Sequence, residues 1–323
     1  MASALVMHTD CGRHDTGWGH PEHQGRLPAI VKAIEAATPT LHNAVIPVDA
    51  RPATEAAIER VHDREYIDSV RSLVHEAERT RSTVIVAGDT AVSPATWAAA
   101  LASTGCAVDA AAVVASGEAE TAFALCRPPG HHATRDRVMG FCFFNNVAIA
   151  ARSLQVDHAV ERILIVDWDV HHGNGTQDIF YEDSSVYYLS LHQSPWYPGT
   201  GHPSERGSGA GYGTTLNIPV HAGTPRLANL AAFDSALATV WREFEPEFVL
   251  ISAGFDSLAG DPLGGLLLEP EDMHAMTRRL CDRAAESRAG RVVALLEGGY
   301  APARTGAGVV ATVHALAGLP MPV

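Results

Sequence analysis

Short apolar runs alternate with longer segments of helical periodicity along most of the chain. A run of roughly four to eight apolar residues between turn residues is typical of a strand buried on both faces, whereas apolar residues three or four positions apart indicate a helix. Pro39 should end the first helix and Thr54 should cap the second. The predicted strands cover residues 4–7, 122–126, 163–166, 186–191, 216–220, 248–252 and 292–296. The predicted helices cover residues 27–37, 54–60, 66–78, 94–115, 147–154, 177–181, 226–244 and 271–287, with a last one from residue 305 onward.

This alternation of strands and helices is typical of an α/β fold. We therefore predict a mainly parallel central sheet with helices on both faces. Neither an internal repeat nor a linker-like stretch interrupts the pattern, so residues 1–323 are expected to form a single domain. Residues 10–28, 89–94 and 192–212 lack periodicity and are rich in glycine and polar residues. We expect them to form loops, and the two long ones are candidates for functional loops.

The composition is that of a globular protein, with 46% hydrophobic and 19% charged residues. The net charge of −14 disfavours direct nucleic-acid binding and would attract a cationic substrate. We find neither an apolar run long enough for a transmembrane helix nor a signal-peptide pattern, so no membrane association is expected. The five cysteines are widely spaced and lack a C-x-x-C pair, which predicts reduced thiols in a cytoplasmic protein. The oligomeric state stays open.

The segment 163–176 contains the strongest candidate chemistry. Its apolar first part predicts a buried strand, after which Asp167, Asp169 and His171 occupy alternate positions. On an extended backbone, side chains at i, i+2 and i+4 point to the same side. Ligands of open α/β sheets bind at the carboxyl ends of strands. These three side chains are therefore candidate metal or proton ligands.

A further aspartate, Asp256, follows the predicted strand 248–252 and would supply a third metal ligand together with Asp169 and His171. Two carboxylates and one imidazole leave positions open on a divalent ion, which is typical of a catalytic site. Zinc suits these nitrogen and oxygen ligands, although Fe(II), Co(II) and Mn(II) also accept them. The alternative interpretation is a polar strand end with solvated carboxylates.

Two other predicted strands end in turns with groups that could handle protons. A proline-rich turn precedes His131 and His132, and one of these imidazoles could take a proton from a water and return it to a leaving amine. Asp167 is free to orient them. Two glycines precede Tyr300, whose hydroxyl could donate to an oxyanion. Taken alone, the histidines could equally be buried structural residues, and the tyrosine a packed aromatic side chain.

The candidate side chains lie within short motifs spread along the chain. These motifs are Arg127-Pro-Pro-Gly-His-His-Ala133, Gly140-Phe-Cys-Phe-Phe-Asn-Asn146, Asp167-Trp-Asp-Val-His-His-Gly-Asn-Gly-Thr-Gln177, Ser252-Ala-Gly-Phe-Asp256 and Glu297-Gly-Gly-Tyr300. In content and order they resemble the signatures of the histone deacetylase superfamily. That superfamily includes bacterial histone-deacetylase-like amidohydrolases, acetylpolyamine amidohydrolases and acetoin-utilisation proteins. Trp168 and Asn174 make the chain more similar to the class II branch.

The resemblance implies the arginase-deacetylase fold and a deacetylase catalytic domain. It implies one zinc ion per chain, held by Asp169, His171 and Asp256. It also implies a potassium ion with five ligand residues, of which the middle ones would bind through their carbonyl groups. The implied potassium ligands are Asp167, Asp169, His171, Ser190 and Leu191.

The resemblance also assigns the catalytic roles. His132 would be the general base and acid, and His131, paired with Asp167, would be an electrostatic helper. Asn174 stands where some members carry a second orienting aspartate, so it gives His132 a neutral partner. Tyr300 would stabilise the transition state, and its presence favours real deacetylase activity over the weakly active members that carry histidine there.

The substrate-binding residues are likewise implied by the resemblance. Phe141 and Tyr197 would wall a narrow tunnel for acyl-lysine, and Gly140 would line it. Asp89 matches an aspartate that grips the substrate backbone. Polyamine-preferring members can carry a glutamate where this chain has Leu263, which disfavours a polyamine substrate without excluding it.

The implied activity is zinc-dependent hydrolysis of the amide in an acyl-lysine peptide or protein, or in another acylated amine. One alternative is an acetylpolyamine or small-amide deacylase that uses the same site. A non-catalytic acyl-lysine binder is disfavoured by the complete set of catalytic residues. A ureohydrolase, whose related fold uses two manganese ions, would differ in metal stoichiometry. The preferred acyl length does not follow from the sequence.

Overall fold

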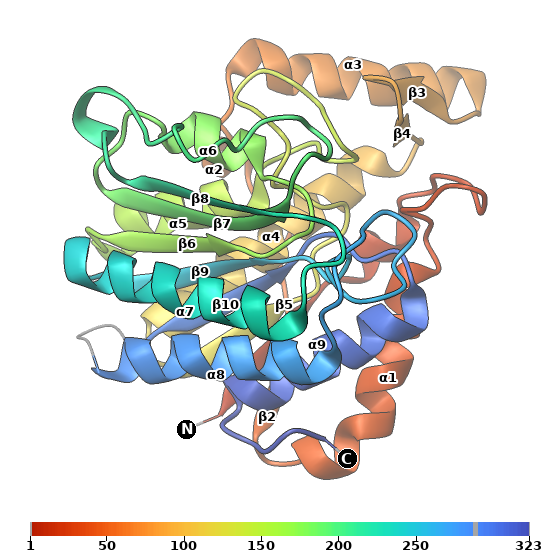
Figure 1. Cartoon of the computed structure of the whole chain (residues 1–323). Helices are drawn as coiled ribbons and strands as arrows, with labels where there is room; N and C mark the ends of the chain where they lie inside the picture. Colours follow the sequence, from red (N-terminus) through yellow and green to blue (C-terminus); the bar gives the residue numbers. More distant parts are fainter. Residues whose placement is uncertain (1, 287–289, 323) are drawn as a thin grey trace.

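The computed structural model describes residues 2–286 and 290–322. Its centre is an eight-stranded parallel sheet with the strand order β2-β1-β5-β10-β9-β6-β7-β8 (Figure 1). A separate two-stranded antiparallel hairpin joins β3 to β4. The strands are β1 (Ser3–Met7), β2 (Val45–Asp49), β3 (Val84–Val86), β4 (Thr90–Val92), β5 (Thr121–Ala124), β6 (Ile163–Asp167), β7 (Val186–Gln193), β8 (Thr215–Val220), β9 (Phe248–Ala253) and β10 (Val292–Leu296).

The apolar runs in the sequence correspond to the central strands of this sheet. Every residue of β5, β6, β7, β9 and β10 is buried, because helices cover both faces. The expectation of a mainly parallel α/β sheet is therefore confirmed. The edge strand β2 escaped prediction because it is only partly buried and contains Pro47, so its sequence shows no continuous apolar run.

The prediction of a simple loop at residues 89–94 was wrong. Thr90 to Val92 form β4, which pairs with β3 across a tight turn at Gly88. Three-residue strands are too short for a recognisable hydrophobic period. The hairpin nevertheless places Asp89 at its tip, where it borders the cavity described below.

Helices lie on both faces of the sheet. In Figure 1, α1, α7, α8 and α9 follow one face, and α4 and α5 lie on the other. The helices are α1 (Arg26–Leu41), α2 (Glu55–Ile58), α3 (Arg64–Thr80), α4 (Thr96–Ala115), α5 (Asn146–His158), α6 (Asn174–Phe180), α7 (Arg226–Glu243), α8 (Pro270–Glu286) and α9 (Pro302–Leu316), with 3₁₀ turns η1 (Thr9–Arg13) and η2 (Gly209–Gly211).

Of the two helix ends that the sequence predicted, the cap at Thr54 is present and the stop at Pro39 is not. Thr54 caps α2 as expected, because its side chain accepts a hydrogen bond from the backbone N–H of Ala57. Pro39 does not end α1, which continues to Leu41. A proline removes only its own donor, and the N–H of His42 still closes the last turn on the carbonyl of Thr38, 2.9 Å away. The predicted end of the helix at Ser287 lies outside the described residues.

Helix α4 corrects the expectation that no apolar segment is long enough for a membrane span. By length and composition its 20 residues could cross a bilayer, and 61% of that window is buried inside the protein. The helix packs against β1 and β5. Helices in the cores of globular proteins pass the same test, and the small polar residues Ser103 and Thr104 contact other buried groups here. We therefore interpret α4 as a core helix.

Four neighbouring strands in the middle of the sheet carry the sequence motifs. In the order β5, β10, β9 and β6, each strand runs in the same direction and ends at the same edge. Parallel pairing therefore gathers four segments that lie far apart in the sequence. This edge is where ligands bind in open α/β sheets.

Candidate functional site

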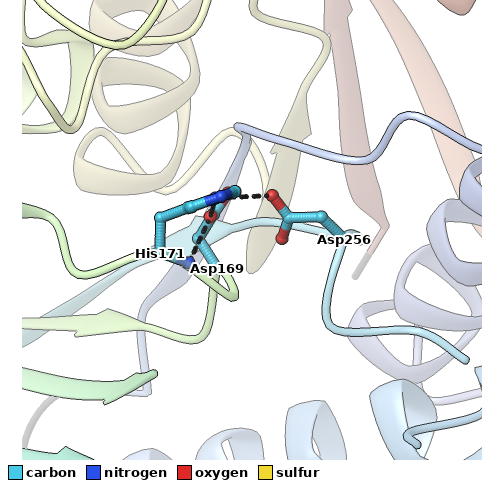
Figure 2. Close-up of side chains that lie close together, drawn as sticks. All are labelled: Asp169, His171 and Asp256. Carbon is cyan, nitrogen blue, oxygen red and sulfur yellow. Dashed lines mark hydrogen bonds and ion pairs between the residues drawn. The ribbon is translucent and has the colours of Figure 1, made fainter. Parts of the chain in front are cut away.

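The three predicted metal ligands meet at the carboxyl ends of β6 and β9. Figure 2 shows Asp169 and His171 reaching from one segment and Asp256 from the other, with their polar atoms turned toward one another. Nδ1 of His171 lies 3.0 Å from Oδ1 of Asp169 and 3.2 Å from Oδ2 of Asp256. One ligand atom from each residue lies within 4.8 Å of the other two. All three side chains are buried.

Backbone N–H groups hold the two carboxylates in place. Val170 donates to Oδ1 of Asp256 over 2.8 Å, and Gly298 donates to Oδ2 of Asp169 over 2.9 Å. A Cβ atom at Gly298 would lie 2.2 Å from Oδ2 of Asp256, so only glycine allows this approach.

These contacts make the three residues fit a divalent metal ion. Bond lengths of about 2.0–2.2 Å around a tetrahedral ion place neighbouring ligand atoms roughly 3.3 Å apart. The measured separations from Nδ1 of His171, 3.0 and 3.2 Å, are close to that spacing. The chemistry of the set, two carboxylates and one imidazole, suits zinc. Buried carboxylates without a compensating positive charge are costly, so a cation bound here would stabilise the group.

His131 forms an ion pair with Asp167. Nδ1 of His131 lies 3.0 Å from Oδ2 of Asp167, and both side chains are buried. Burial opposes the imidazolium form, but the negative charges of Asp169 and Asp167 raise the pKa of His131 to about 10. The hydroxyl of Tyr188 donates a second hydrogen bond to the same carboxylate oxygen over 3.1 Å. The ion pair with Asp167 therefore favours the charged form of His131 and holds its ring in place.

His132 has a different environment. Its Nδ1 lies 2.8 Å from the side-chain oxygen of Asn174, at the start of α6. Burial, followed by the neighbouring charge of His131, lowers the pKa of His132 well below its usual value. The residue is thus neutral near pH 7 and able to accept a proton. The environments of the two adjacent histidines therefore shift their pKa values in opposite directions.

Tyr300 follows β10, and charged groups contact both its backbone and its ring. The carboxylate of Asp261 accepts hydrogen bonds from the backbone N–H groups of Tyr300 (2.6 Å) and Ala301 (3.1 Å). The guanidinium of Arg26 lies 4.9 Å from the centre of the tyrosine ring. Burial raises the pKa of the Tyr300 hydroxyl well above its usual value, so the hydroxyl keeps its proton and remains a donor.

A cavity of about 520 Å³ connects these groups to the surface. His132, His171 and Tyr300 line it together with Gly140, Phe141, Tyr197, Leu263 and Asp89. The structure therefore brings all five residues that were predicted to bind substrate to one cavity. The ring of Tyr197 is edge-on to His132 at 5.2 Å, and the ring of Phe141 is edge-on to Tyr300 at 5.9 Å. Gly140 leaves room for the base, because a Cβ atom there would lie 2.3 Å from the imidazole of His132.

The sequence analysis missed several residues around the cavity mouth. Nε2 of His20 lies 2.9 Å from the carbonyl oxygen of Asp89. The indole N–H of Trp196 donates to the carbonyl oxygen of Leu263 over 2.8 Å, and Ile85 reaches the mouth from β3. The only sequence signal for Trp196 was its place beside Tyr197 in a predicted loop. Its contact with Leu263 joins residues 67 positions apart and could not be anticipated.

A buried ionic cluster that contacts Tyr300 through Arg26 was also missed. Glu22 pairs with Arg26 at 2.9 Å and with Arg127 at 2.7 Å, and none of these side chains is exposed to solvent. Arg26 also donates to the carbonyl oxygens of Glu297 and Gly299, 2.7 Å from each. Glu22 and Arg26 are four residues apart, a spacing that allows an ion pair on a helix. Both residues lie in a segment that we expected to be a loop, so this spacing did not lead to a prediction.

The potassium site stays a prediction. Ser190 pairs with Asp167 in the register of β6 and β7, and Leu191 follows it. The implied residues therefore lie close together. The hydroxyl of Ser190 is 2.9 Å from Nδ1 of His192, and no structural observation on the described residues identifies a potassium ligand set.

Comparison with known proteins identifies the family of the chain. The histone deacetylase domain matches residues 20–316 of the chain. Histone deacetylase 10, chloroplastic, of Oryza sativa subsp. japonica is 40% identical over 93% of this chain and 70% of its own length. A probable deacetylase of Archaeoglobus fulgidus is 38% identical over 93% of this chain and 82% of its own length.

A solved structure extends the likeness to three dimensions. The crystal structure of the HDA15 HD domain superposes with a TM-score of 0.91 and 34% identity, covering 99% of this chain and 90% of that one. The parallel sheet with its helices is thus the arginase-deacetylase fold. Domain match, sequence identity and structure agree that the chain belongs to the histone deacetylase superfamily.

Proposed function

We propose that this chain is a zinc-dependent deacylase that hydrolyses the amide bond of acyl-lysine in a peptide or protein. Membership of the family makes the chain a deacetylase-type hydrolase. The observation that supports the finer assignment is that His132, Tyr300 and His171, one of the three gathered metal-ligating residues, line the same cavity. A divalent ion held by Asp169, His171 and Asp256 lowers the pKa of water and polarises a carbonyl when it is bound.

His132 acts as the base in this proposal. Because an amide oxygen only accepts hydrogen bonds, the contact with Asn174 puts the proton on Nδ1 and leaves Nε2 with a free lone pair. Nε2 takes the proton of the attacking water and passes it to the leaving lysine amine. The positive charge of His131 opposes a second charge on His132, which favours return of that proton.

Tyr300 stabilises the transition state in this proposal. Attack on the acyl carbonyl turns its oxygen into an oxyanion, and a hydrogen bond to a charged oxygen is roughly twice as strong as one to a neutral oxygen. The hydroxyl of Tyr300 keeps its proton because burial raises its pKa. Its hydrogen bond therefore contributes most at the top of the barrier.

The cavity walls favour a long apolar stem. Phe141 and Tyr197 present aromatic rings on the way to His132 and Tyr300, which suits the methylene chain of lysine. Asp89 lies exposed at the mouth, where its carboxylate can accept hydrogen bonds from the backbone of a peptide substrate. Leu263 adds no second carboxylate beside that of Asp89 for the distal ammonium of a polyamine.

Several accompanying assignments are part of the same proposal. We propose a potassium ion near Asp167 and Ser190, and a single catalytic domain over residues 1–323. The five cysteines are free thiols, which supports a reducing compartment such as the cytoplasm. We propose no direct binding of nucleic acid and no membrane association, in line with the net charge of −14 and the buried α4.

A panel of acyl-lysine peptides and acetylated polyamines, assayed with the purified protein, tests the proposed function. We expect kcat/KM to be higher for the peptides than for the polyamines. A preference for polyamines would overturn the substrate assignment and leave the deacylase chemistry intact. Binding of acyl-lysine peptides without any turnover would overturn the enzymatic proposal.

A further inference from the structure

Glu297 is a buried carboxylate that the proposed chemistry does not use. It is the first residue after β10 and 1% of its surface is exposed. Tyr300 lies three residues further along the same segment. A carboxylate is rarely buried without strong partners, because its removal from water is costly. The partners of Glu297 therefore indicate its role.

The carboxylate binds the turn that carries the two histidines. Oε2 of Glu297 accepts hydrogen bonds from the backbone N–H of Gly130 over 2.7 Å and of His131 over 3.2 Å. Oε1 has no hydrogen-bond partner among the described residues. The contact joins segments 167 residues apart in the sequence, and it links the end of β10 to the turn after β5.

Other groups hold the carbonyl oxygens of this turn. The side chains of Ser103 and Asn146 donate to Pro128, the N–H of Ala133 donates to Gly130, and the N–H of Thr176 donates to His131. Glu297 supplies the acceptor for the N–H groups of Gly130 and His131, at the centre of the turn. Loss of that acceptor would leave two buried donors unpaired, and the turn would have to move to satisfy them.

The main chain of Glu297 is fixed on the opposite side. Its N–H donates to Ala253 at the end of β9 over 3.1 Å, and its carbonyl oxygen accepts from the guanidinium of Arg26 over 2.7 Å. The next N–H, of Gly298, donates to Asp169. Glu297 is thus anchored to the strand ends that carry the metal ligands, and its side chain reaches from there to the histidine turn.

We propose that Glu297 is a positioning residue, which fixes the turn bearing His131 and His132 against the strand end bearing Tyr300. The base and the oxyanion donor come from different strands, β5 and β10, and both must meet the same acyl carbonyl. A shift of about 1 Å in such an alignment can cost on the order of 10²-fold in rate. Glu297 acts through hydrogen-bond acceptance rather than by contact with the substrate. This role rests on the proposed function.

Two substitutions separate hydrogen-bond acceptance from charge. In Glu297→Gln the amide oxygen still accepts both N–H groups, whereas Glu297→Leu keeps the approximate size and removes the acceptor. For E297L we expect kcat to fall on the order of 10²-fold. KM should change by less than about threefold, because Phe141, Tyr197 and Asp89 come from other segments. For E297Q we expect kcat within about fivefold of the parent, because its acceptor is kept.

Glu247→Leu is the matched control. Glu247 also accepts a backbone N–H from a distant segment, that of Glu161 over 2.9 Å, but it lies at the other end of the sheet. We expect E247L to leave kcat and KM unchanged. Metal content per chain should be equal in all these proteins.

Hydrogen–deuterium exchange gives a readout that does not depend on turnover. In E297L the amides of residues 127–133 should exchange faster, on the order of tenfold, whereas E297Q and E247L should match the parent there. Should E297L fail to fold, Glu297→Asp takes its place, because the shorter side chain cannot reach both N–H groups. If the parent hydrolyses none of the tested substrates, the proposed function fails, and exchange alone decides the role of Glu297.

Three results would overturn the proposal. The first is unchanged exchange over residues 127–133 in E297L or E297D. The second is a kcat within about twofold of the parent in the same variant, far from the loss expected of a misaligned base. The third is an equal loss in E297Q and E297L, which would show that the charge matters and the hydrogen-bond acceptor does not.

Discussion

Nδ1 of His132 and the side-chain oxygen of Asn174 are 2.8 Å apart, and this contact fixes which nitrogen of the base carries its proton. The amide nitrogen of Asn174 faces the carbonyl of His132 and the sulfur of Met139, each at 3.5 Å, which agrees with this orientation of the amide. The partner of the base is neutral. It orients the imidazole and favours the imidazolium less than a carboxylate would.

Replacing Asn174 by aspartate should change the pH dependence of the reaction. The pKa of His132 is low because of burial and the charge of His131. A carboxylate at position 174 favours the imidazolium, so it raises that pKa by about one unit or more. The base is active when deprotonated, so the acidic limb of kcat/KM should move to higher pH. A pH–rate profile with an unmoved acidic limb would show that His132 is not the titrating base.

Tyr300→Phe should lower kcat and spare substrate binding. The hydroxyl donates to an oxygen that becomes charged only in the transition state, and loss of one such donor costs about 10²–10³-fold in kcat. KM, metal content and fold should stay close to those of the parent. Steady-state kinetics test this directly. A kcat within about twofold of the parent would mean that the hydroxyl has no role in oxyanion stabilisation.

Elemental analysis should find one tightly bound divalent ion per chain. Asp256 contributes one of the three gathered ligand atoms. Asp256→Ala should therefore lose both the ion and the activity, and Asp234→Ala, on the surface helix α7, serves as the control. Two equivalents of manganese in the parent protein would instead favour ureohydrolase chemistry.

Leu263→Glu should move substrate preference toward acetylated polyamines. Leu263 lines the cavity mouth, and a carboxylate there would attract the distal ammonium of a polyamine. The relevant quantity is the ratio of the kcat/KM values for the polyamine and the peptide. Leu263→Gln, which adds polarity without charge, is the matched control. An unchanged ratio in the glutamate variant would remove Leu263 from the determinants of specificity.

Stability should fall in mild acid, in part because of His62. Its Nε2 accepts the N–H of Asn145 over 2.9 Å, so the folded state needs the neutral ring, and burial lowers the pKa of His62 to about 4. Between pH 6.5 and 4, His62 binds a proton in the unfolded chain but stays neutral in the folded chain. The free energy of unfolding therefore decreases as pH falls through this window. From pH 7.5 to 5 this residue should remove roughly 2 kcal/mol of the free energy of unfolding.

Urea unfolding of the parent and of His62→Gln at the two pH values checks the contribution of His62. The variant keeps an acceptor near the position of Nε2 but does not titrate. Its loss of stability between pH 7.5 and 5 should therefore be smaller than that of the parent. Equal losses would show that other groups govern acid destabilisation.

The sequence carried most of the information about the metal site. The sequence placed Asp169 and His171 just after a buried strand, and parallel pairing brought Asp256 to the same edge. The extended backbone expected there is absent, because β6 ends at Asp167 and residues 169–171 form a bend. Glu297 and Trp196 could not be found in this way. Their partners, Gly130 and Leu263, lie 167 and 67 residues away, and such contacts depend on how loops pack after the sheet has formed.

Trp196 lines the cavity and is held there by a hydrogen bond to the main chain of Leu263. Its indole N–H binds the carbonyl oxygen of that residue, an atom that every amino acid possesses. The side chain at position 263 can thus be exchanged while the indole keeps its partner. Mutation and selection can therefore vary this position through single substitutions, and new substrate ranges can evolve there without rebuilding the wall of the tunnel.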